Sequence, residues 1–109
     1  MIEDIDYLVS AVMYDPSEFK IKKVLSHKRK DQYGVGYPFE ERRKQLLKKI
    51  GNGRCYYTLV QRENTGFEYN VGNEIKKVEI DSETYLRTDD REEKKDYLGG
   101  LQRLRDLPY

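Results

Sequence analysis

The stretch RCYYTLVQR, residues 54–62, decides the fold, and further strand-like runs follow it as far as residue 88. Aromatic and β-branched side chains alternate along it, which is typical of a strand with at least one buried face. Turn residues at 63–66 and 72–73 separate it from runs at 67–71 and 75–80, and a last run covers 84–88. The sequence therefore predicts a β-meander in this region.

Two more strands are predicted ahead of the meander, at residues 5–14 and 19–27. Residues 7–14 are apolar on both faces apart from Ser10, which indicates a central strand that is covered on both sides. An Asp-Pro-Ser-Glu turn at 15–18 separates the two runs and favours a hairpin.

One long helix is predicted, at residues 39–50. Pro38 suits the first turn of such a helix, Glu40 and Glu41 suit its positive end, and Gly51 suits its stop. The side chains that would form its apolar stripe are Phe39, Leu46, Leu47 and Ile50. Residues 31–38 then become a mobile connecting loop, and the leucines spaced by three from Leu98 predict a short C-terminal helix or turn.

These elements predict an α+β fold in the order β-β-α-β-β-β-β. We expect an antiparallel, strongly curved sheet or small open barrel with the helix packed on it. At 109 residues the chain has room for one modest core, so residues 1–109 are expected to form a single domain.

Three phrases of the meander also carry a resemblance. They are Tyr56-Tyr57-Thr58, then Gly72-Asn73-Glu74-Ile75 with Val78, then Tyr85-Leu86-Arg87-Thr88-Asp89. In order and spacing they resemble a family of small bacterial and phage proteins known as domain of unknown function three-eight-nine-two. Tyr97 and Gln102 depart from the family pattern, which has Asn and Pro at those places. The resemblance implies a single compact domain with no assigned activity.

Charge is distributed unevenly along the chain, although the net charge is only +1. Residues 20–54 hold 12 Lys and Arg against three acids, whereas residues 1–19 hold five acids and no base. Such a basic segment favours phosphate or an acidic protein patch, and the alternative is a solvated face that keeps the protein soluble.

The sequence offers little for catalysis, because it contains one Cys and one His. Cys55 lies on a predicted strand, where a small buried hydrophobe is the commoner role. His27 lies among Lys28, Arg29 and Lys30, whose positive charge opposes metal binding. We therefore expect no enzyme, no metal and no cofactor.

The function predicted from these features is that of a small non-catalytic binding module from a bacterium or phage. Its partner would be anionic, either an acidic protein surface or a nucleotide or nucleic acid. The alternatives are a phage-encoded inhibitor of a host protein, such as a defence component, and a nucleic-acid-binding protein. The predicted partner-binding residues are Lys28, Arg29, Lys30, Tyr33, Tyr37, Arg42, Arg43 and Arg87.

Arg87 has a second reading, in which it pairs with a carboxylate or carbonyl on the rim of the sheet. The acidic N-terminus lacks the features of a secretory signal, and the chain has no apolar run of membrane-spanning length. We expect a cytoplasmic protein without membrane contact, as a monomer or homodimer.

Overall fold

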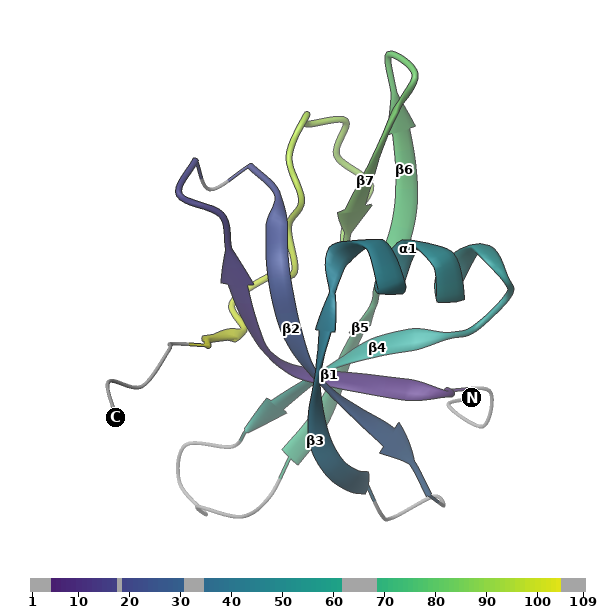
Figure 1. The fold of residues 1–109 in the computed structure, drawn as a ribbon, viewed down its shortest axis with the longest axis vertical. Coiled ribbons are helices and arrows are strands. Elements are labelled where there is room, and N and C mark those ends of the chain that lie inside the picture. Colours follow the sequence, from purple (N-terminus) through teal and green to yellow (C-terminus); the bar gives the residue numbers. More distant parts are fainter. Residues whose placement is uncertain (1–4, 18, 31–34, 62–68, 105–109) are drawn as a thin grey trace.

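The computed structural model describes residues 5–17, 19–30, 35–61 and 69–104. Its single helix and its strands confirm an α+β fold (Figure 1). In chain order the elements are β1 (Tyr7–Tyr14), β2 (Ile21–Arg29), β3 (Val35–Arg42), α1 (Arg43–Gly51), β4 (Tyr56–Gln61), β5 (Tyr69–Glu74), β6 (Lys76–Ile80), β7 (Glu83–Arg87) and β8 (Gln102–Arg103).

The main sheet has the order β3-β2-β1-β4-β5, which places β1 at its centre as predicted. Strand β2 lies antiparallel along one edge of β1, while β4 and the short β8 share the other edge and run parallel to it. The sheet is therefore mixed and open, and the prediction of a wholly antiparallel sheet is wrong at these two pairings. Buried Leu8 and Val9 point to opposite faces, so β1 is covered on both sides as expected.

Strand β3 replaces residues 35–38 of the predicted loop and the first turn of the predicted helix, while residues 31–34 of that loop lie outside the described residues. Its alternating Val35, Tyr37 and Phe39 suit a strand, and Pro38 is tolerated because β3 is an edge strand of the described sheet. The helix begins only at Arg43, so Glu40 and Glu41 belong to the strand. The first turn of the helix therefore contains no acidic residue. The amide of Arg42 donates to Gln45 Oε1, 2.8 Å away, at the helix start.

The main core lies between the sheet and α1. Leu46 is completely buried there, and Leu47 and Ile50 pack at its margin, so the predicted apolar stripe holds for these three residues. The core comprises Val9, Val12, Ile21, Val24, Leu46, Tyr56, Ile75, Leu86, Leu98 and Leu101. A smaller cluster of Ile5, Leu8 and Leu59 is separate from it.

Strands β6 and β7 form a separate two-stranded hairpin that projects beyond α1 (Figure 1). Asp81 and Ser82 both have positive φ, as a two-residue hairpin turn requires. Leu98 and Leu101 are buried, but a turn and β8 follow instead of a helix within the described residues. Among the residues that the structure describes, no helix has the length and apolar character needed to cross a membrane.

Candidate functional site

Two β-bulges meet at His27, one on each neighbouring strand. On β1 the extra residue is Ser10, which lies between the pairs Val9–Ser26 and Ala11–Leu25. On β3 two residues, Gly36 and Tyr37, lie opposite the single residue Lys28, between the pairs His27–Pro38 and Arg29–Val35. Bulges redirect side chains and carbonyls and are common beside functional sites.

The bulges bring a hydrogen-bonding group to each nitrogen of the imidazole. Nδ1 of His27 lies 3.0 Å from the carbonyl of Gly36, which can only accept, so Nδ1 carries a proton. Nε2 lies 2.7 Å from Ser10 Oγ and accepts from that hydroxyl when the ring is neutral. A side chain on Gly36 would approach the Lys28 carbonyl to 3.1 Å, which explains the glycine. Both nitrogens are thus used inside the protein.

A cavity of about 390 Å³ opens beside the imidazole, and we call it the His27 hollow. Its lining consists of His27, Lys30, Val35, Gly36, Tyr37, Pro38 and Leu59. One ammonium group, an aromatic ring and aliphatic groups thus surround it, without a carboxylate among these residues. Its volume lies at the low end of the range for small-ligand sites.

The structure brings part of the predicted binding set together at this hollow. Tyr37 is 89% exposed, and the Lys30 ammonium lies 6.0 Å from the centre of its ring. Lys28 is exposed at the same end of β2, and Arg29 is half-buried between these two lysines in the sequence. Tyr33 lies outside the described residues.

Arg42 and Arg43 lie at the other end of β3. Arg42 is exposed, but it lies five positions along the strand from Tyr37, which corresponds to a distance of roughly 16 Å. Arg43 instead reaches inward, where its Nε donates to Asp96 Oδ2 at 2.7 Å and its Nη2 donates to the Thr84 carbonyl at 2.6 Å. Arg43 therefore serves the interior of the fold.

Asp96 is a buried carboxylate that joins three elements. Besides Arg43 of α1, it accepts from the backbone amide of Ile21 in β2 at 2.8 Å and from that of Leu86 in β7 at 2.9 Å. The charge of Asp96 is compensated, because a cation and two amides surround it. This side chain fixes the hairpin of β6 and β7 against the main sheet.

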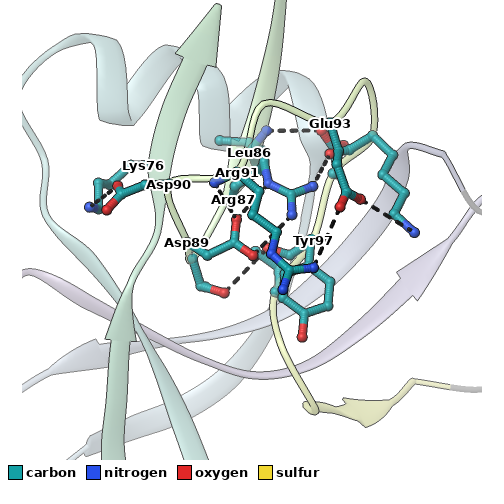
Figure 2. Close-up of polar contacts among 12 residues, drawn as sticks. Lys76, Leu86, Arg87, Asp89, Asp90, Arg91, Glu93 and Tyr97 are labelled. Carbon is teal, nitrogen blue, oxygen red and sulfur yellow. Dashed lines mark hydrogen bonds and ion pairs between the residues drawn. The ribbon is translucent and has the colours of Figure 1, made fainter.

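Arg87, in the phrase that resembles a family, is only 1% exposed. Its guanidinium binds Asp89 through two hydrogen bonds, of 2.7 and 3.0 Å, and donates to the Lys95 carbonyl at 2.9 Å (Figure 2). The ring of Tyr97 lies 5.2 Å from the guanidinium carbon. The hydrogen bond from Arg87 lowers the pKa of the Asp89 carboxyl from its ordinary value. The reading in which Arg87 pairs with a carboxylate or carbonyl is confirmed.

A second buried ionic cluster lies under α1. The Tyr56 hydroxyl donates to Glu41 Oε1 at 2.7 Å, and the Lys49 ammonium lies 2.7 Å from Glu41 Oε2. Burial, together with this carboxylate, raises the pKa of the Tyr56 phenol. The same ammonium lies 4.6 Å from the ring centre of Tyr7 and 5.5 Å from that of Phe39. Lys49 is therefore engaged within the protein.

The sequence did not predict the role of Ser10 or Gly36, although each carried a signal. Ser10 interrupts an otherwise apolar strand, and Gly36 precedes a tyrosine in a run that looked like a loop. No group of three or more His, Cys, Asp or Glu that could hold a metal ion occurs among the described residues.

Comparison of the chain with known protein families, curated proteins and solved structures finds no match. The resemblance of the Tyr85–Asp89 phrase to the bacterial and phage family therefore stays a prediction.

Proposed function

We propose that the protein is a non-catalytic binding module that engages an anionic partner through the end of the β2–β3 hairpin. The contacting surface consists of Lys30 and Tyr37 at the His27 hollow, with Lys28 exposed at the same end of β2. The observation that carries the proposal is the make-up of this hollow, whose lining combines an ammonium group with an exposed aromatic ring and, among the described residues, includes no carboxylate.

Ion pairs within the described part of the chain engage some basic residues of the segment 20–54 and leave others exposed, among them Lys28 and Lys30. Of the basic residues in the segment 20–54, Lys23 pairs with Glu40, Arg43 with Asp96 and Lys49 with Glu41. Lys28 and Lys30 have no ion pair within the described part of the chain, and both are exposed. Their positive charge is thus directed towards solvent, where it attracts anions over about a Debye length.

A second cavity, of about 330 Å³, is less suited to an anion. It lies beside the end of α1, and its lining includes the basic residues Arg54, Lys76 and Lys77 but also Glu74. Arg54 lies 3.9 Å from the Asp6 carboxylate. Lys76 moreover pairs with Asp90 at 3.1 Å. A carboxylate in the wall repels an anionic ligand, which favours the His27 hollow.

Charge reversal tests the proposal. The probes are a fluorescein-labelled thymidine oligonucleotide of about ten nucleotides and a labelled polyglutamate peptide, whose binding is followed by fluorescence anisotropy. We expect the wild type to bind at least one of them, and more weakly as salt increases. The double variant Lys28→Glu/Lys30→Glu should lose that binding and keep its circular dichroism spectrum, because both side chains are exposed.

The matched control is Lys44→Glu/Lys48→Glu, which makes the same change in net charge on the exposed side of α1. It should bind nearly as well as the wild type. Equal losses in the two double variants would show that binding follows net charge alone. Absence of binding to both probes by the wild type would refute the proposed function.

A further inference from the structure

We propose that the His27 hollow holds one base of a nucleotide or single-stranded nucleic acid, stacked on Tyr37, with its phosphate bound by Lys30 and attracted by the nearby charge of Lys28. This inference rests on the proposed function and narrows the anionic partner to one chemical class. Three features of the hollow carry it: its walls, the exposure of Tyr37 and the position of the two lysines.

The walls suit a flat ring. Because both nitrogens of His27 already have partners, the imidazole offers the hollow its carbon atoms and π face rather than a free donor or acceptor. Val35, Pro38 and Leu59 add aliphatic surface. Such flat and aliphatic groups can bind a base through stacking, which tolerates any base, while the polar part of the lining, including Lys30, faces its phosphate.

Tyr37 is placed as a stacking platform. With 89% of its surface exposed, this side chain contributes little burial to the stability of the fold. The bulge near Gly36 sets the course of the strand from which the ring projects. Lys30 lies 6.0 Å from the ring centre, at the outer limit of a cation–π contact, and a base can take its place.

Lys30 lies where the phosphate of a stacked nucleotide needs it, because it is itself part of the lining. Lys28 follows His27 along β2, so its side chain lies on the other face of the strand and adds only longer-range positive charge at the same end of the sheet. An acidic peptide would use the same two charges, but it would leave the face of Tyr37 and the aliphatic wall without a matching group. The combination of ring and cations therefore favours a nucleotide over a carboxylate chain.

The test separates the base from the charge. Anisotropy competition compares the thymidine oligonucleotide with an abasic deoxyribose-phosphate oligomer that has the same number of phosphates. We expect the wild type to prefer the oligomer with bases by about fivefold or more, as one stacked base requires. Tyr37→Leu should remove this preference, while Tyr37→Phe should retain it because the ring and not the hydroxyl makes the contact.

Phe19→Leu is the control, since Phe19 is another exposed aromatic residue, at 57%, and is not part of the hollow. It should keep the preference for bases. Competition by thymidine monophosphate distinguishes a free nucleotide from a nucleic-acid strand as the natural ligand. An affinity per site similar to that of the oligonucleotide indicates a free nucleotide, and a much lower affinity indicates a strand.

The inference would be overturned if the wild type bound the two oligomers with equal affinity. It would also be overturned if the Tyr37→Leu variant kept the preference for the oligomer with bases. Either result would leave the proposed function standing. Binding of polyglutamate alone would assign the surface to an acidic protein instead. If neither oligomer nor polyglutamate binds, the inference and the proposed function both fail.

Discussion

Arg87 holds the segment after β7 in place through its own side chain. It lies almost completely buried, and its hydrogen bonds reach Asp89 and the Lys95 carbonyl. A guanidinium that is removed from water needs such partners, because an unpaired buried charge is costly. The most distinctive residue of the sequence is therefore engaged in folding rather than presented to a partner.

Replacing Arg87 should accordingly affect stability. We expect Arg87→Ala to lower the free energy of unfolding by about 2–3 kcal/mol, since it removes a buried bidentate pair whose carboxylate is partly solvated. Arg91→Ala is the control, because Arg91 is 76% exposed and its ion pair is long, at 3.7 Å. It should change the unfolding free energy by less than about 0.5 kcal/mol. Chemical denaturation measures both, and an Arg87→Ala protein that melts normally but no longer binds would reverse this assignment.

At this scale the sequence predicted local partners but not distant ones. Arg87 and Asp89 are two residues apart, so their pairing could be anticipated from the phrase itself. Arg43 and Asp96 are separated by 53 residues, and Asp96 lies in a charge-rich run that looked solvent-exposed. Only the packing of α1 against β7 brings them together. For this reason Arg43 was predicted as a partner-binding residue, whereas its guanidinium binds Asp96 and the Thr84 carbonyl.

Among the elements, β4 and β5 show how closely the sheet is packed. Thr58 of β4 is buried, and its hydroxyl accepts the backbone amide of Asn73 at 3.0 Å. A Cβ atom on Gly72 would lie 2.2 Å from that hydroxyl oxygen. Glycine is therefore required for the close approach of the two strands.

Gly72→Ala should destabilise the protein by roughly 1–3 kcal/mol, because the threonine must rotate away and lose its hydrogen bond, or the strands must separate. Gly100→Ala is the matched control, since nothing lies within 4 Å of its Cβ position. The melting temperatures of the two variants are compared by thermal unfolding. Equal melting temperatures would contradict the packing of β4 against β5 described here.

The strands were largely predictable because their alternation is a local signal, and those at 7–14, 56–61 and 76–80 lie within the predicted ranges. Strand β3 was missed because Gly36 and Pro38 are turn and helix-start residues in most settings. Their tolerance here depends on the bulge and on the edge position of β3, and both are properties of the assembled sheet. The parallel pairing of β1 with β4 likewise follows from the crossover through β3 and α1.

For the molecule as a whole, the fold separates the basic residues into two groups. Several are neutralised internally, by Glu40, Glu41 and Asp96, and these ion pairs join strands and helix to one another. Lys28 and Lys30 remain exposed at one end of the β2–β3 hairpin, and Lys30 lines the His27 hollow. Other basic residues of the segment 20–54 are exposed elsewhere, namely Lys20, Lys22, Arg42, Lys44 and Lys48, so the two lysines differ from these in lying at the end of the sheet that carries the hollow.

Mapping the binding surface residue by residue tests this account most directly. Isotope-labelled protein is titrated with the thymidine oligonucleotide, and the backbone amide signals are followed by NMR. We expect the largest shifts at residues 27–30 and 35–37, with little change in α1 or at residues 83–97, because the ring, the cations and the hollow all lie at that end of the hairpin. Largest shifts in α1 or around Arg87, with residues 27–30 and 35–37 unchanged, would contradict it.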